Sequence, residues 1–205
     1  MSQLSIPSPS VGAFHLGPLT IHIYALCILA GIVIAYIGGE RRYQACDGKQ
    51  EHFEELCTLG VIAGIIGGRL YHVITDHQLY FGPGRTWYHS LFIWQGGLGI
   101  WGAITLGGLA ILLYCWHKDI RFAPVADSLA PGILAAQAIG RLGNWFNQEL
   151  FGRPTSLPWG LEIDLAHRPA GYLQYATFHP TFLYELLWNL AGAAFLVWAD
   201  RRWTL

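Results

Sequence analysis

The chain has 205 residues, of which 53% are hydrophobic and only 12% are charged, and its net charge is -1. About a quarter of the residues of an ordinary soluble domain are charged, so this composition excludes that class and favours an integral membrane protein. The twelve basic residues are scattered and form no phosphate-binding cluster, which excludes a nucleic-acid-binding surface.

Five predominantly apolar stretches approach the length of about 20 residues that a helix needs to cross a bilayer. In chain order they are residues 18–37, 56–75, 91–114, 123–140 and 181–198. The first 17 residues contain no Lys or Arg, so we expect no cleaved signal peptide and the first stretch is retained. The sequence predicts an all-α, polytopic membrane helix bundle that forms one transmembrane domain over residues 1–205.

Basic residues in the connections predict the orientation of the spans, because cytoplasmic loops carry an excess of Lys and Arg. One set of connections contains Arg41, Arg42, Lys49, Lys118, Arg121, Arg201 and Arg202, whereas the other contains Arg85, Arg153 and Arg168. Five spans with the N-terminus outside satisfy this pattern.

The connection over residues 150–180 differs from the others because it contains four prolines and mixed charges. Its apolar residues Trp159, Leu161, Ile163 and Leu165 alternate with polar ones, as in a half-buried strand. We therefore expect a small extracytoplasmic cap here. The sequence shows no internal repeat of the kind found in many transporters.

Glycine and cysteine residues add two expectations. Gly60, Gly64 and Gly68 recur every four residues, which favours close packing of another helix. Gly96 and Gly97, in "WQGGLGIWGA", could serve packing equally well or leave bare backbone facing a ligand. The four cysteines have no CxxC or His-spaced pairing, so we expect neither a disulfide framework nor a metal site.

Ionisable side chains lie inside or at the edges of these spans, where charge is costly and usually functional. If the fourth span continues as a helix, Gln137, Arg141, Asn144 and Gln148 share one face, and Glu149 flanks it. In the last span, Glu185 occupies a similar polar face with Thr181 and Asn189.

Two interpretations of these polar residues stay open at this point. Glu185 could simply pair with Arg69 or Arg141, since buried charges must be paired in any membrane protein. Alternatively, the polar face binds a charged amphipathic ligand. A guanidinium binds phosphate well, and the abundant phosphate of a membrane belongs to phospholipids.

Residues 140–160, "GRLGNWFNQELFGRPTSLPWG", resemble the signature of bacterial prolipoprotein diacylglyceryl transferases. Supporting pieces occur in the family's order, and the similarity covers essentially the whole chain. They are "HIYAL" at 22–26, "GGRLYHV" at 67–73, "WQGGLGIWGA" at 94–103, "DSLAPG" at 127–132 and "FHPTFLYE" at 178–185.

The resemblance implies an enzyme of the bacterial cytoplasmic membrane, with phosphatidylglycerol and the lipobox of a prolipoprotein signal peptide as partners. It would join the lipid's diacylglyceryl group to the lipobox cysteine as a thioether and release glycerol phosphate. It implies no metal or organic cofactor. The catalytic candidates are Arg141, Asn144, Glu149, Tyr24 and His179. The candidates for substrate binding are Arg69, Gln95, Gly96, Gly97, Asn147, Gly152 and Glu185.

The sequence departs from the family pattern in two ways. Several members carry a histidine where this chain has Trp101, so we consider His179, His22 or Glu149 as substitute bases and favour activation of the thiol by arginine charge. Members commonly have about seven spans, against five here. The chain is therefore expected to be a fragment or a natural short form, and the alternative function is a truncated, non-catalytic lipid-binding membrane protein.

Overall fold

The computed structural model describes residues 5–17, 19–93 and 96–202, which fold into two compact units. Unit 1 comprises Met1–Arg41 and Asp127–Leu205, and unit 2 comprises Arg42–Ala126. The assignment of residues 1–205 to a single domain stays a prediction.

Five long helices dominate the described part of the chain, and each is long and apolar enough to cross a membrane. They are α1 (Ile23–Ala45), α2 (Gln50–Thr75), α3 (Ile100–His117), α4 (Phe122–Asn147) and α5 (Thr181–Arg202). β-structure among the described residues is limited to two short antiparallel pairs and two isolated bridges, Ile6 with Leu161 and Pro154 with Phe178. The expectation of a polytopic helix bundle is confirmed.

The first span begins later than the sequence predicted. Residues 19–22 belong to strand β2 (Leu19–His22), which pairs with β1 (Ala13–Leu16) in a hairpin, and α1 begins only at Ile23. The apolar run continues through the hairpin, and this is why hydropathy alone set the boundary at residue 18. Tyr24 consequently lies in the first turn of α1.

The third span also begins later, at Ile100 rather than at residue 91. Gly96 and Gly97 have φ values of 83° and 76°, a left-handed backbone that cannot continue a right-handed helix. Residues Trp87–Leu91 form a short 3₁₀ helix instead.

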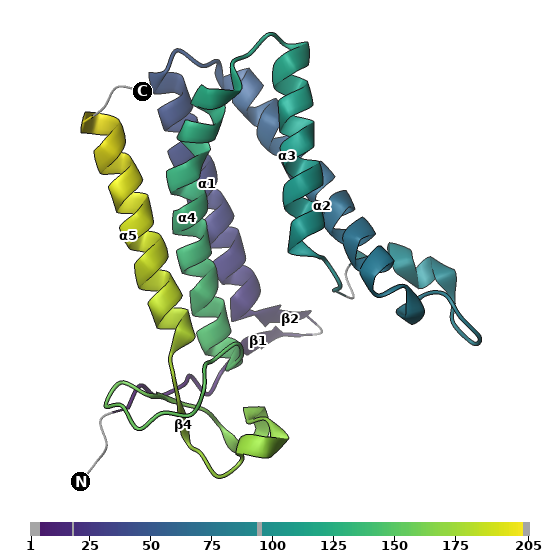
Figure 1. Cartoon of the computed structure of the whole chain (residues 1–205), viewed down its shortest axis with the longest axis vertical. Helices are drawn as coiled ribbons and strands as arrows, with labels where there is room; N and C mark the ends of the chain where they lie inside the picture. The colour runs from purple at the N-terminus through teal and green to yellow at the C-terminus, as the bar shows by residue number, and fades with distance from the viewer. Residues whose placement is uncertain (1–4, 18, 94–95, 203–205) are drawn as a thin grey trace. The chain divides into compact units, whose positions relative to one another are not determined.

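Helices α1, α4 and α5 lie side by side in unit 1 (Figure 1). Gly31 of α1 faces the backbone of Ala136, and Gly132 of α4 faces the backbone of Ala35. On the other side of α4, Leu134 reaches Gly192 of α5. Such small residues let helix backbones approach closely, which is a main source of helix association in membranes.

The cap packs against the end of α4 and the start of α5. Its strands β3 (Leu161–Glu162) and β4 (Thr177–Phe178) pair, so the alternation noted in the sequence forms a strand only over two residues. The buried cluster beneath them consists of Leu161, Ile163, Phe178 and Phe182, and the partly buried Trp145 of α4 stacks on Phe182 at 5.4 Å. This core holds the cap on the helix ends that carry the candidate site.

Unit 2 is built on a close pairing of α2 with α3, as the glycine pattern predicted. A Cβ atom at Gly60 would meet Ile111, one at Gly64 would meet the carbonyl of Ala103, and one at Gly68 would meet the carbonyl of Gly99.

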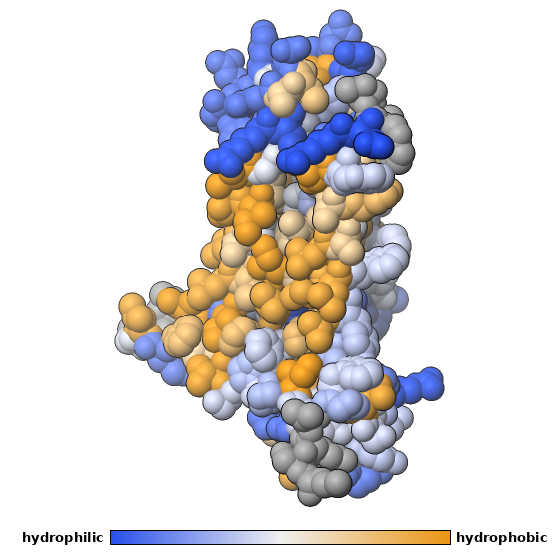
Figure 2. Space-filling view, turned by 90° about the vertical axis from the view of Figure 1, so that its left-hand side faces the viewer, coloured by the Kyte–Doolittle hydropathy of each residue, from blue (hydrophilic) through white to orange (hydrophobic). Residues whose placement is uncertain are grey.

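The outer surfaces of the helices are apolar. On α5, Leu187, Trp188, Phe195 and Trp198 are exposed, with Trp188 at 80%. Figure 2 shows the face on which α5 lies, where a hydrophobic band runs between hydrophilic residues at the two ends. A water-soluble protein would not expose such a band, whereas a membrane-spanning helix presents it to lipid.

Candidate active site

Helix α4 ends in a turn that bends the signature sequence back on itself. The amide of Glu149 donates to the carbonyl of Asn144 at 3.1 Å, and the amide of Gln148 donates to the carbonyl of Trp145 at 3.2 Å. This pair of bonds is a Schellman motif, in which the first residue beyond the helix is left-handed, and Gln148 has φ 52°. The turn brings Glu149 back beside the last turn of α4.

A chain of polar contacts follows from that turn. The carboxylate of Glu149 accepts hydrogen bonds from Asn144 Nδ2 at 2.9 Å and from Asn147 Nδ2 at 3.2 Å. Asn144 in turn accepts a bond from Arg141 Nη1 at 3.3 Å, and its side chain is buried. The amide of Asn144 is therefore oriented by a cation on one side and an anion on the other.

Arg141 also pairs with Glu185 of α5, with 2.5 Å between Nη2 and Oε2. Of the two partners that the sequence allowed for Glu185, Arg141 is the one that it contacts. Both terminal nitrogens of the guanidinium have partners, so its plane is held between α4 and α5. An anionic ligand that binds Arg141 through both nitrogens must therefore exchange with Glu185 or Asn144.

Tyr24 reaches the same part of α4 from α1. Its ring lies against Gly143, so closely that a Cβ atom at this position would overlap the ring. Gly143 sits between Arg141 and Asn144 in the sequence, and the absence of a side chain there is what admits the tyrosine.

The cap contributes two more of the predicted residues, Gly152 and His179. The amide of Gly152 donates to the carbonyl of His179 at 3.0 Å, which ties the signature to the start of α5. His179 Nδ1 lies 3.1 Å from the hydroxyl of Tyr184, which also accepts a bond from Trp159 Nε1 at 3.1 Å. Sequence reasoning missed Tyr184, although it adjoins Glu185 in "FHPTFLYE".

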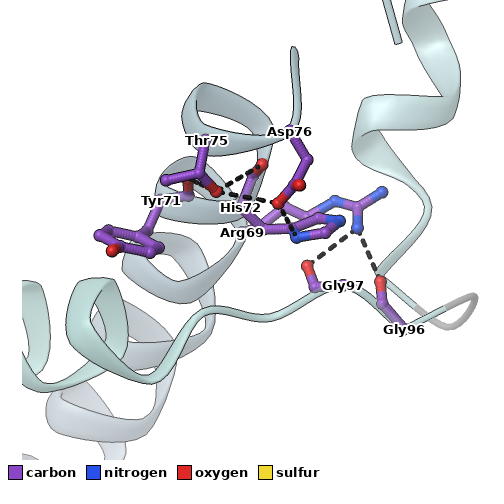
Figure 3. Close-up of polar contacts among 7 residues, drawn as sticks. All are labelled: Arg69, Tyr71, His72, Thr75, Asp76, Gly96 and Gly97. Carbon is purple, nitrogen blue, oxygen red and sulfur yellow. Dashed lines mark hydrogen bonds and ion pairs between the residues drawn. The ribbon is translucent and has the colours of Figure 1, made fainter. Parts of the chain in front are cut away.

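In unit 2, Arg69 binds backbone carbonyls rather than an acidic side chain (Figure 3). Nη1 donates to Gly96 at 2.7 Å and to Gly97 at 3.0 Å, while Nε and Nη2 donate to the carbonyls of Ser90 and His89. The side chain is 7% exposed. These contacts shape the loop before α3, and the assignment of Arg69, Gly96 and Gly97 to substrate binding stays a prediction. Gln95 lies outside the described residues.

Beside Arg69, His72 forms an ion-pair contact that the sequence analysis did not anticipate. His72 Nδ1 lies 3.0 Å from Asp76 Oδ2, and the ring meets Tyr80 edge-on (centroids 5.9 Å apart). The i, i+4 spacing of the two residues on α2 was the available signal.

Comparison with known proteins identifies the group to which this architecture belongs. A family model described as "Prolipoprotein diacylglyceryl transferase" matches residues 11–204. The chain belongs to the prolipoprotein diacylglyceryl transferase family.

Relatives named phosphatidylglycerol–prolipoprotein diacylglyceryl transferase align with the whole chain. The protein of Cutibacterium acnes is 87% identical, and the chain covers 69% of its length. The second such protein of Streptomyces coelicolor is 54% identical with 65% covered, and that of Corynebacterium efficiens is 51% identical with 67% covered. The chain thus spans about two thirds of the length of these relatives.

The structure shows how the signature of the prolipoprotein diacylglyceryl transferase family, residues 140–160, is folded in this chain. The signature forms about the last two turns of α4, the Schellman turn and the first segment of the cap. Its polar residues Arg141, Asn144, Asn147 and Glu149 form one hydrogen-bonded group.

Proposed function

We propose that this chain transfers the diacylglyceryl group of phosphatidylglycerol to the lipobox cysteine of a prolipoprotein. The protein works in the bacterial cytoplasmic membrane, with its N-terminus and cap outside. Membership of the family and the names of the relatives support the reaction. The five apolar helices support the location in a membrane.

The reaction is a substitution at carbon, without oxidation or reduction. The cysteine sulfur forms a bond to the terminal glycerol carbon of the diacylglyceryl group, and the bond from that carbon to the phosphate oxygen breaks. The electron pair of the broken bond leaves with glycerol phosphate, and the thiol proton is lost to an acceptor. Both the thiolate and the leaving phosphate need positive charge nearby.

The observation that carries the proposal is the guanidinium of Arg141, held between Asn144 and Glu185 on facing membrane helices. Once the phosphate has exchanged with these partners, a donor held in a site of low dielectric stabilises its developing charge strongly, because no further rearrangement is needed during the chemical step. Arg141 therefore binds the phosphate and stabilises the leaving group.

The other candidates take supporting roles. Asn144, held by Glu149, orients glycerol or phosphate oxygens, and Tyr24 closes the site from α1. His179 is the candidate proton acceptor at the cap, where Tyr184 orients its ring. Asn147 fixes the carboxylate of Glu149, and Gly152 fixes the backbone at His179. The positive charge of Arg141 favours the thiolate form of the lipobox cysteine.

The test measures transfer of the diacylglyceryl group from phosphatidylglycerol to a lipobox peptide by purified protein. We expect Arg141→Ala or Asn144→Ala to lower the rate at least a hundredfold, as loss of one preorganised donor commonly does (about 10² to 10³), while membrane insertion stays intact. Arg201→Ala is the matched control, since it removes the same charge from the last turn of α5.

Unchanged rates in both site variants would overturn the assignment of Arg141 and Asn144. A wild-type chain that binds phosphatidylglycerol vesicles without transferring lipid would instead establish the alternative, a non-catalytic lipid-binding membrane protein.

A further inference from the structure

Within the described part of the chain, three helices end in the same turn. In α1, α3 and α4 the last turn closes through two backbone bonds around a left-handed residue: Asp47 (φ 60°), Asp119 (φ 55°) and Gln148 (φ 52°). Glycine is the usual residue at this position, because it has no Cβ atom to crowd the carbonyl oxygen. In all three turns, the left-handed position is therefore occupied by a residue that adopts this conformation less readily than glycine does.

Gln148 differs from the other two. Aspartate visits the left-handed region comparatively easily because its short side chain bonds locally, whereas glutamine lacks that advantage. Leu150 is also left-handed, with φ 53°. Glu149 thus stands between two strained residues, and strained backbone persists where surrounding structure holds it in place.

Hydrogen bonds of the Gln148 side chain hold this strained backbone in place. It is 4% exposed, its Oε1 accepts a bond from the amide of Asp164 at 2.8 Å, and its Nε2 donates to Asp164 Oδ2 at 2.6 Å. Nε2 also donates to the carbonyl of Pro9 at 3.3 Å. One buried amide therefore joins the end of α4 to the cap and to the N-terminal segment.

We propose that Gln148 is a positioning residue, whose bonds to Asp164 and Pro9 lock the left-handed turn that directs the Glu149 carboxylate onto Asn144 and Asn147. Through this lock, the seating of the cap on α4 controls the orientation of Asn144 beside Arg141. The inference rests on the proposed function for the role of Asn144 and Glu149, but the lock itself can be measured without activity.

The first experiment measures amide hydrogen exchange in detergent-solubilised protein. Gln148→Gly removes the side-chain bonds and relieves the backbone strain at the same position, so the two effects oppose each other. We expect the Glu149 amide, which bonds to Asn144, to exchange at least tenfold faster in this variant. Asp119→Gly is the matched control: it places glycine at the equivalent left-handed position of the α3 turn, where the described residues give the side chain no such bonds. The amide that follows it, Ile120, should stay at least as protected as before.

Unchanged protection of Glu149 in Gln148→Gly would overturn the proposal, because the side-chain bonds would then stabilise the turn by no more than the strain that glycine relieves. Protection of the Ile163 amide, bonded to Ala176 within the cap, reports whether the cap itself remains folded.

The second experiment asks whether Gln148 acts through Glu149, using kcat for lipid transfer. We expect Gln148→Gly and Glu149→Gln each to lower kcat about tenfold or more, with no further loss when they are combined, since interacting residues are not additive. A purely structural role would give multiplied losses and would overturn the inference. If Glu149→Gln alone leaves kcat unchanged, the proposed function of Glu149 fails, and the exchange experiment still decides the lock.

A rescue variant tests whether a substitution at Gln148 lowers kcat through the Asp164 contact or through general disruption of the protein. Gln148→Glu places two carboxylates together, and adding Asp164→Asn restores a donor and acceptor pair. We expect the double variant to recover most of the kcat lost in Gln148→Glu. No recovery would contradict the role assigned to the Asp164 contact.

Discussion

At the scale of single residues, Arg141 is already neutralised before any substrate binds. Glu185 contacts Nη2 and Asn144 contacts Nη1, so the guanidinium is both oriented and occupied. Burying a cation without a partner in a membrane is expensive, which explains why a counter-ion is present. An incoming phosphate must then compete with the Glu185 carboxylate for the same cation.

We therefore expect Glu185→Gln to bind glycerol phosphate more tightly than the wild type. The amide keeps the shape of the side chain but removes a negative charge that repels the ligand. At an effective dielectric constant of about 20, such a charge is worth several kcal/mol at close range, so a gain of about tenfold is a conservative expectation.

The measurement is the inhibition of lipid transfer by glycerol phosphate, compared between the two proteins. Weaker inhibition of Glu185→Gln would contradict competition, and would mean that the carboxylate mainly orients Arg141.

At the scale of elements, glycines set how closely the helices approach. α1 meets α4 through Gly31 and Gly132, and Tyr24 rests on Gly143. The sequence indicated close packing by Gly60, Gly64 and Gly68 through their spacing, and the structure confirms it. The role of Gly143 could not be predicted in this way, because its partner Tyr24 lies about 120 residues away in the chain and no spacing pattern in the sequence links the two residues.

We expect Gly143→Ala to displace the Tyr24 ring, because the added methyl group overlaps it. Overpacking of this kind costs about 1 to 3 kcal/mol, so the melting temperature in detergent should fall and the transfer rate should fall with it. Gly140→Ala is the matched control on the same helix, since its Cβ atom would only touch Ile28 at 3.5 Å.

Melting temperatures and transfer rates measured side by side decide this prediction. Equal behaviour of the two alanine variants would show that the close approach of Tyr24 to Gly143 contributes neither to stability nor to activity.

At the scale of the whole molecule, the distribution of basic residues predicts the orientation. The end of α1 with the α1–α2 connection, the α3–α4 connection and the end of α5 together carry seven of the twelve Lys and Arg residues, whereas the cap carries two. The proposal therefore places the α1–α2 connection in the cytoplasm and the cap outside.

Native Cys46 and a cysteine introduced in the cap test this arrangement. Cys46 is free and exposed between α1 and α2, and Gly171 of the cap has open space around it. With a membrane-impermeant maleimide, we expect Gly171→Cys to be labelled in intact cells, and Cys46 to be labelled only after the membrane is broken. Labelling in the opposite order would reverse the proposed topology.

The sequence by itself determined the fold class, the five apolar helices and the shared face of Arg141 and Asn144. These follow from composition, from hydropathy and from the helical period, all of which are local properties of the chain. The boundaries at Ile23 and Ile100 were missed because apolar residues continue through a hairpin and a glycine turn.

Only the tertiary structure showed that Glu185 pairs with Arg141 and that the Tyr24 ring occupies the space where a side chain at position 143 would lie. It also showed how "GRLGNWFNQEL" folds back so that Glu149 contacts Asn144. Each depends on atoms that are brought together by helix packing or by the lock of Gln148 on Asp164. A periodic pattern can place residues on one face of a helix. It cannot say what lies opposite that face, because that distance is set by the packing of distant segments.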